Sequence, residues 1–153
     1  MKQKFIDLYM DWARRTTKLS HARRLQVGAV IVKDDSVISY GYNGTPAGWD
    51  NNCEYDVTEL RSDPHRGTWL EHTGEIRTRP EVMHAERNAL DKLARKGNVG
   101  GDGAAMFITH APCMECAKSI YGAGIKAVYY AEDYRYTDGI DFLRKCQVEV
   151  HKV

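Results

Sequence analysis

Two short motifs carry residue types that could hold a metal ion. The first, at residues 84–86, reads His-Ala-Glu, and the second, at residues 112–116, reads Pro-Cys-Met-Glu-Cys. Imidazole nitrogen and thiolate sulfur are preferred ligands of zinc, and a catalytic zinc keeps its fourth position open for water. The two motifs therefore predict a catalytic zinc site with three protein ligands, which are His84, Cys113 and Cys116.

Glu86 lies two residues after His84, close enough to act at the metal without binding it. Zinc lowers the pKa of a bound water molecule toward neutrality, so that the water can react at physiological pH. A carboxylate beside that water can accept its proton and pass it to the substrate and the leaving group. We therefore predict that Glu86 is the catalytic proton shuttle of a hydrolytic reaction.

Each motif alone has other interpretations. A Cys-x-x-Cys pair can be redox-active, and a glutamate near a helix start is common in proteins that bind no metal. A structural zinc usually has four protein ligands, whereas these motifs supply three. Together the motifs favour an open catalytic zinc over a redox pair, and metal analysis of the purified protein would separate the two.

Both motifs are expected at the starts of helices. Pro80 and Glu81 open a predicted helix that runs to about Lys96, and a further helix is predicted at residues 114–123. Two helix N-termini directed into one cleft would bring the ligands together, and their positive ends would favour ionised thiols.

The spacing of apolar residues predicts the remaining elements. We expect helices at residues 3–19 and 139–145, and strands at residues 27–32, 37–42, 105–109, 126–130 and 148–150. The first two strands should form a hairpin, and the alternation of strands and helices after residue 80 favours a layered α/β sheet. A length of 153 residues fits a single domain spanning the chain.

Residues 43–80 are the exception, because they show no sustained period and are rich in Gly, Pro, Asn, Asp and Thr. A loop of this length is uncommon in a compact domain, and is usually functional, self-structured or disordered. The region also holds several side chains that argue against a purely flexible loop, namely Trp49, Cys53, His65, Trp69 and His72.

The composition is that of an ordinary globular protein, with 42% hydrophobic and 28% charged residues. A formal net charge of +1 does not indicate a nucleic-acid partner. The sequence shows neither a long apolar run for a membrane span nor an apolar signal core at its start. We therefore expect a cytoplasmic protein with no nucleic-acid or membrane partner.

The sequence resembles a known family, the zinc-dependent deoxycytidylate (dCMP) deaminases of the cytidine deaminase superfamily. The zinc deaminases carry His-x-Glu followed by Pro-Cys-x-x-Cys. The resemblance runs from about Gln26 to Val150. It rests on Val-Gly-Ala-Val-Ile-Val at 27–32, Gly-Tyr-Asn-Gly-Thr-Pro at 41–46, His-Ala-Glu-Arg-Asn-Ala at 84–89 and Pro-Cys-Met-Glu-Cys-Ala-Lys at 112–118.

The resemblance implies a three-layer α/β/α fold with a five-stranded mixed sheet, and the zinc ligands and proton shuttle named above. It also implies that Asn43 bonds the deoxyribose, that the Ala85 backbone holds the pyrimidine edge and that Tyr134 lies near the nucleotide. Asn43 in an Asn-Gly pair is also a good turn residue, and Tyr134 could be a packing aromatic. Arg23 and Arg24 could bind a phosphate, but a solvated helix end is favoured.

The implied activity is hydrolytic deamination of dCMP to dUMP, which supplies thymidylate synthesis in pyrimidine metabolism. The family resemblance further implies a homo-hexamer that is activated by dCTP and inhibited by dTTP, with Mg²⁺ accompanying these triphosphates. The regulatory site would include residues of the glycine-rich motif, which are Gly41, Tyr42, Asn43 and Gly44.

The segment from Glu54 to Arg79 matches no shared motif and looks like an insertion. Some phage-type relatives carry a second, structural zinc in this region. The candidate ligands here are His21, Cys53, His72 and Glu81, with His65 as a substitute. The alternative is an ordinary buried cysteine with exposed histidines.

Three other functions compete with this interpretation. A tRNA adenosine deaminase shares the motifs but should show a basic surface, and a nucleoside cytidine deaminase usually has Cys in place of His84. A zinc module that only binds ligands would not need Glu86. A redox protein would lack zinc.

Overall fold

The computed structural model describes residues 1–97 and 100–153. In chain order its elements are α1 (Gln3–Thr17), β1 (Gly28–Lys33), β2 (Ser36–Tyr42), β3 (Glu54–Asp63), β4 (Gly67–Thr78), α2 (Ala85–Lys96), β5 (Ala105–His110), α3 (Met114–Gly122), β6 (Ala127–Glu132), α4 (Asp138–Lys145) and β7 (Glu149–Lys152).

The main sheet has five strands in the order β2-β1-β5-β6-β7. β1 is antiparallel to both β2 and β5, whereas β6 is parallel to β5 and β7 is parallel to β6. The expected five-stranded mixed sheet is therefore confirmed, and all five strands were expected within a residue or two of their observed bounds.

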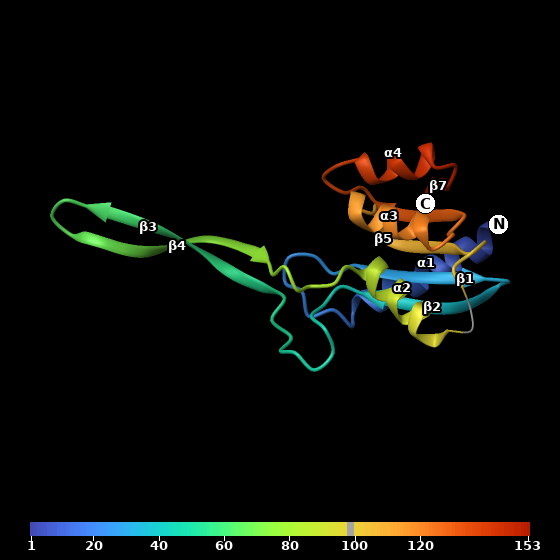
Figure 1. The fold of residues 1–153 in the computed structure, drawn as a ribbon, viewed down its shortest axis with the longest axis horizontal. Helices are drawn as coiled ribbons and strands as arrows, with labels where there is room; N and C mark the ends of the chain where they lie inside the picture. The colour runs from blue at the N-terminus through green and yellow to red at the C-terminus, as the bar shows by residue number, and fades with distance from the viewer. Residues whose placement is uncertain (98–99) are drawn as a thin grey trace.

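Helices cover both faces of this sheet (Figure 1). One face of α1 is apolar at helical spacing and packs on alternate residues of β1 and on Phe107 of β5. The rings of Phe107 and Tyr129 stack there with centroids 4.7 Å apart. The opposite face of the sheet packs against α2, α3 and α4, through residues such as Ile31, Ile108 and Leu93. These are the three layers that the resemblance implied.

Gly41 explains how closely β2 approaches the start of α2. A Cβ atom at this position would lie 2.1 Å from the backbone oxygen of Ala85 and 2.5 Å from the nitrogen of Ala89. No side chain can occupy that space without moving the helix backbone. The glycine therefore sets the position of the helix that carries the first motif.

The second predicted helix begins later than expected, at Ala85 instead of Pro80. Met83 pairs with Gly44 through two backbone hydrogen bonds of 3.1 and 2.9 Å, and His84 has an extended backbone. This pairing keeps the residues before Ala85 out of the helix, so His84 caps α2 and Glu86 lies in its first turn.

Most of the region at residues 43–80 is a long β-hairpin, a structure that the sequence did not predict. β3 and β4 pair antiparallel in a separate two-stranded sheet, and this hairpin projects far from the body (Figure 1). We call residues 54–78 the arm. Leu60 and Leu70 are 70% and 66% exposed. With neither face of its sheet buried, the arm lacks the apolar alternation that marks a strand in sequence.

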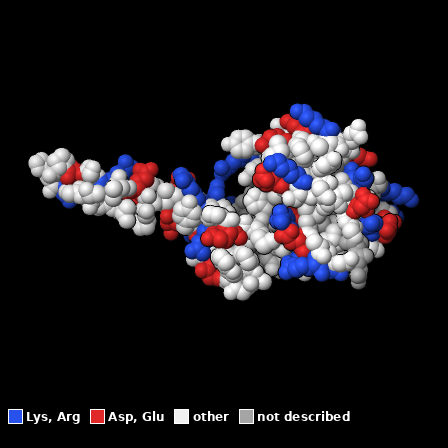
Figure 2. Space-filling view, in the orientation of Figure 1, with Lys and Arg blue, Asp and Glu red and all other residues white. Residues whose placement is uncertain are grey.

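Charged side chains of both signs are interspersed over the face of the body shown in Figure 2. None of the helices in the described part of the chain is long and apolar enough to cross a membrane.

Candidate metal centre

The structure brings together the three predicted zinc ligands at the starts of α2 and α3. Their ligand atoms all lie within 4.8 Å of one another. His84 Nδ1 is 3.4 Å from Cys116 Sγ and 3.6 Å from Cys113 Sγ. Within residues 1–97 and 100–153, this is the only group of three side chains placed to hold a metal ion.

The donor set fits zinc, since it consists of one imidazole nitrogen and two sulfurs. His84 is exposed, Cys113 is half-buried and Cys116 is buried, so the group is open on one side. The pKa of Cys113 falls to about 3, because its sulfur accepts hydrogen bonds from the Cys116 thiol and the His84 imidazole. These hydrogen bonds to the Cys113 sulfur also raise the pKa of the two donors, Cys116 and His84. Deprotonated sulfur is the form that binds metal.

Glu86 is buried beside these ligands, with only 4% of its surface exposed. Burial raises the pKa of its carboxyl group, and the nearby His84 opposes that rise. A raised pKa makes the protonated carboxyl group more accessible, which suits a group that must both accept and release a proton.

A cavity of about 240 Å³ opens beside the metal centre. The predicted residues Asn43, Ala85, Glu86 and Tyr134 all line it, together with His84 and Cys113. Sequence reasoning assigned no role to three other polar residues of the wall, which are Glu54, Thr78 and His110. Burial lowers the pKa of His110, which favours the neutral imidazole.

The side-chain amide of Asn43 forms hydrogen bonds to the backbone of the cavity wall through both its oxygen and its nitrogen. Its Oδ1 accepts a hydrogen bond of 2.8 Å from the Val27 backbone, and its Nδ2 donates one of 2.7 Å to the Leu25 carbonyl. The amide has a further lone pair and a further hydrogen. The turn role and the substrate role predicted for Asn43 are therefore compatible.

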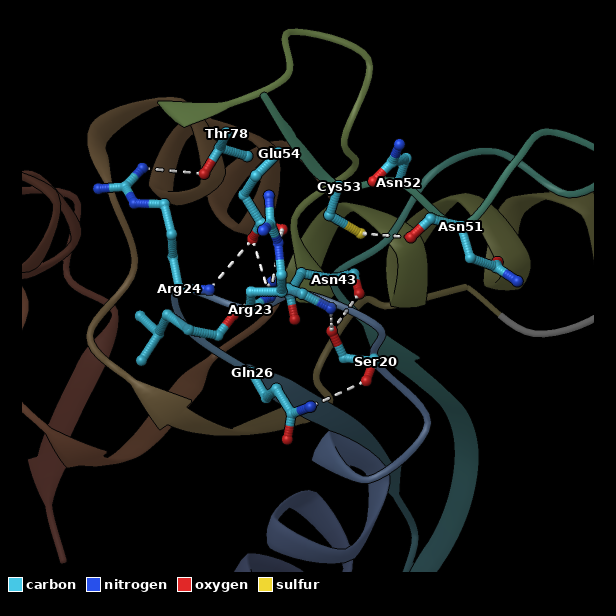
Figure 3. A network of polar contacts seen from close by, with 12 residues as sticks. Ser20, Arg23, Arg24, Gln26, Asn43, Asn51, Asn52, Cys53, Glu54 and Thr78 are labelled. Carbon is cyan, nitrogen blue, oxygen red and sulfur yellow. Dashed lines mark hydrogen bonds and ion pairs between the residues drawn. The ribbon is translucent and has the colours of Figure 1, made fainter. Parts of the chain in front are cut away.

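Arg24 also lines the cavity; its side chain is exposed, as expected, but it does not lie at a helix end. α1 ends at Thr17, and Arg23 and Arg24 lie in a bend that follows it. The buried carboxylate of Glu54 anchors this bend from the base of the arm (Figure 3). The hydrogen bond between the Arg24 backbone and Glu54 could not be predicted from the sequence, because 30 residues separate the two.

Within the described residues, the four predicted ligands of a second zinc do not form a group of three that could hold a metal ion; they are His21, Cys53, His72 and Glu81. Cys53 is 1% exposed and packs in an apolar cluster with Ala22 and Val82, and burial raises the pKa of its thiol. His72 pairs with Thr58 within the arm, and His65 lies in the turn between β3 and β4. The arm thus places both histidines away from Cys53, and the described residues give no support to a second site.

A second cavity, of about 410 Å³, lies next to the predicted regulatory motif. Tyr42 and Gly44 line it, whereas Asn43 lies in the wall of the first cavity and Gly41 packs against α2. Lys92 and Arg95 of α2 add positive charge, and the Lys92 ammonium lies 5.1 Å from the centre of the Tyr42 ring. His21 and Cys53 both line this cavity.

Comparison with known proteins gives consistent matches. Residues 3–132 match the model of the cytidine and deoxycytidylate deaminase zinc-binding region. The chain is 34% identical to the deoxycytidylate deaminase of Enterobacteria phage T4, with 84% of this chain and 79% of that protein covered. It is 42% identical to ComE operon protein 2 of Bacillus subtilis over 73% of this chain, but spans only about half (51%) of that protein's length.

A crystal structure of the dCMP deaminase from the cyanophage S-TIM5, in complex with dCMP and dUMP, has the same fold. It is 39% identical, superposes with a TM-score of 0.80 and covers 100% of this chain and 99% of its own.

Proposed function

Because the chain belongs to the cytidine and deoxycytidylate deaminase family, we propose that it hydrolyses dCMP to dUMP and ammonia. The observation that carries the proposal is the group of His84, Cys113 and Cys116 beside the buried Glu86 in one cavity. The cyanophage enzyme of the same fold, whose structure contains dCMP and dUMP, supports this choice of substrate.

We propose that His84, Cys113 and Cys116 hold the zinc ion, which would lower the pKa of a bound water molecule. The metal would supply an activated water for attack on C4 of the cytosine ring, and the Glu86 carboxylate would accept the first proton of that water and deliver it to N3. Glu86 would carry the second proton, from the oxygen newly bonded to C4, to the 4-amino group, which would leave as ammonia as C4 becomes a carbonyl. Its burial beside the cavity keeps the carboxyl group in reach of these atoms.

Three further residues would position the nucleotide. Ala85 is fully buried at the start of α2 and lines the cavity, so its backbone can meet the pyrimidine edge. The remaining donor and acceptor of Asn43 suit a deoxyribose hydroxyl. The half-buried Tyr134 lines the same cavity and would pack against the nucleotide.

For regulation, we propose that dCTP and dTTP, with Mg²⁺, compete for the second cavity. Lys92 and Arg95 complement the negative charge of a triphosphate, and Tyr42 offers a ring for stacking. Tyr42 and Gly44 flank Asn43, whose amide holds the wall of the first cavity. An effector that binds two arrangements of this segment with different affinity would change dCMP binding.

We further propose a cytoplasmic homo-hexamer whose product supplies thymidylate synthesis. The family membership supports these proposals, and coupling between subunits would give sigmoidal kinetics. dCTP should lower the dCMP concentration at half-maximal rate, and dTTP should raise it.

The test is an ammonia-release assay of zinc-loaded protein with dCMP, dCTP, deoxycytidine and adenosine as substrates. We expect dCMP to be preferred by kcat/KM. Equal values for dCMP and deoxycytidine would contradict the substrate assignment. Hyperbolic kinetics that neither triphosphate changes, with magnesium present, would contradict only the regulatory proposal.

A further inference from the structure

α2 lies along β2, which is the end strand of the main sheet (Figure 1). Three side chains of this helix, each one turn after the last, donate hydrogen bonds to backbone carbonyls of the strand. Asn88 Nδ2 donates to the Tyr42 carbonyl at 2.8 Å, Lys92 Nζ to the Tyr40 carbonyl at 3.2 Å, and Lys96 Nζ to the Ile38 carbonyl at 3.1 Å. We call these three hydrogen bonds the ladder.

The spacing of the ladder matches the geometry of both elements. Four residues of a helix advance about 6 Å, and two residues of a strand advance about 6.6–6.8 Å. Donors at every fourth position of the helix therefore meet carbonyls at every second position of the strand, with the two elements running in opposite directions. A shift of α2 along β2 would lengthen all three hydrogen bonds together, so the ladder favours a single register between the helix and the strand.

Two buried contacts between β2 and α2 support the same register. Ser39, which is 3% exposed, donates a hydrogen bond of 2.7 Å from its Oγ to the Ala89 carbonyl. The space beside Gly41 is filled by the backbone of Ala85 and Ala89. The Ser39 hydrogen bond is shielded from water, whereas Lys96 is exposed, so we expect Ser39 to hold the register more strongly than Lys96.

The ladder begins between two parts of the candidate site. Asn88 lies one turn after His84 and two residues after Glu86, on the helix that carries both. Its acceptor, Tyr42, immediately precedes Asn43, which lines the same cavity as Glu86. The register of α2 on β2 therefore sets the position of Glu86 relative to Asn43. Catalysis is sensitive to such placement, since a displacement of about 1 Å caused far from the chemistry can cost about 100-fold in rate.

We propose that Asn88 and Ser39 are positioning residues for the reaction, and that the ladder keeps Glu86 at the reacting atoms of a nucleotide that Asn43 holds by its sugar. The proposal rests on the proposed function, because it concerns the same substrate and the same reacting groups. Ser39 and Lys96 line neither cavity, so they act through α2 and not by contact with a ligand.

The first experiment measures kcat and KM for dCMP in Asn88→Leu, Ser39→Ala and Lys96→Met, without triphosphates and per zinc-loaded chain. We expect kcat to fall about 10- to 100-fold in Asn88→Leu, about 3- to 10-fold in Ser39→Ala and about 2- to 4-fold in Lys96→Met. KM should change less than about threefold, because the residues that line the first cavity all remain.

Two further variants separate the ladder from a general effect of lost charge. Lys96→Arg keeps a donor at the same position and should restore the rate that Lys96→Met loses. Lys118→Met is the matched control on α3, because Lys118 is also exposed, pairs with Glu115 and lines neither cavity. It should keep the wild-type kcat.

A merely structural role predicts a different result. It would lower Tm but leave kcat per zinc-loaded chain at the wild-type value in assays run well below Tm. Wild-type kcat in both Asn88→Leu and Ser39→Ala would therefore overturn the positioning role.

The second experiment needs no turnover. His84 caps α2, whereas Cys113 and Cys116 lie at the start of α3, so a loosened α2 should hold the imidazole less well against the two sulfurs. In competition with a chromophoric chelator, we expect the zinc dissociation constant of Asn88→Leu to rise about 3- to 10-fold, and that of Lys118→Met to stay at the wild-type value.

Failure of the wild-type protein to deaminate dCMP would remove the proposed function, and the zinc measurement would then decide the role of the ladder by itself. An unchanged dissociation constant in Asn88→Leu would overturn that role.

Discussion

The metal centre and the arm place their side chains in opposite surroundings. Cys116 and Glu86 are each only 4% exposed and lie on helices that pack against the sheet. Leu60 and Leu70 are mostly exposed on a two-stranded sheet whose outer ion pairs are also exposed. Two-stranded hairpins are marginally stable alone, and exposed ion pairs add little. The body therefore holds the reacting groups, and of the described arm residues only Glu54 and Thr78, at its base, line the cavity.

Among the changes considered, replacing the metal ligands should cause the largest loss of zinc binding and of activity. In the double variant Cys113→Ser/Cys116→Ser, bound zinc should fall from one per chain to almost none, and deamination should be lost, because two of three ligands are removed. Metal analysis by plasma mass spectrometry measures this, with Cys146→Ser as the control that keeps its zinc. Full zinc occupancy in the double variant would sink the ligand assignment.

Glu86→Gln should abolish turnover without removing the metal. The amide keeps the shape of the side chain but cannot carry the proton, and general acid–base groups contribute about 10²- to 10⁴-fold to rate. We expect kcat for dCMP to fall by at least that factor while zinc content stays unchanged. Turnover near the wild-type rate would show that another group moves the proton.

Apolar side chains of the body and of the arm should differ sharply in their contribution to stability. Phe107→Ala removes a ring that is fully buried between α1 and the sheet, and should lower the free energy of unfolding by about 3–5 kcal/mol. Leu70→Ala on the arm should change it by less than about 0.5 kcal/mol. Urea unfolding of both variants tests this contrast. Similar losses in both would mean that the arm is buried against another molecule.

Shortening the arm should have the smallest effect. Residues 57–75 can be replaced by Asn-Gly, a turn that suits a two-residue hairpin between the paired residues Asp56 and Ile76. Because Glu54 and Thr78 remain, we expect kcat/KM for dCMP within about twofold of the intact protein, and a Tm shift below the roughly 2–4 °C that 1 kcal/mol would cause. A large loss of activity would show that the outer arm contributes to the cavity.

The zinc trio and the main sheet could be predicted because their signals are local. His84 and Glu86 share one short motif, Cys113 and Cys116 share another, and the buried strands are short β-branched runs. The arm could not be predicted, since a strand exposed on both faces has no apolar period. The position of Arg24 beside the cavity could not be predicted for a different reason, because a carboxylate 30 residues away holds its backbone.

The exposed indole of Trp69 gives the arm its own optical signal. This side chain is 40% exposed, and the two other tryptophans, Trp12 and Trp49, lie outside the arm. With both of those replaced by phenylalanine, tryptophan fluorescence would come from the arm alone. A shift of that emission to shorter wavelength on mixing with another molecule would record the loss of water around the arm, without any label attached to the protein.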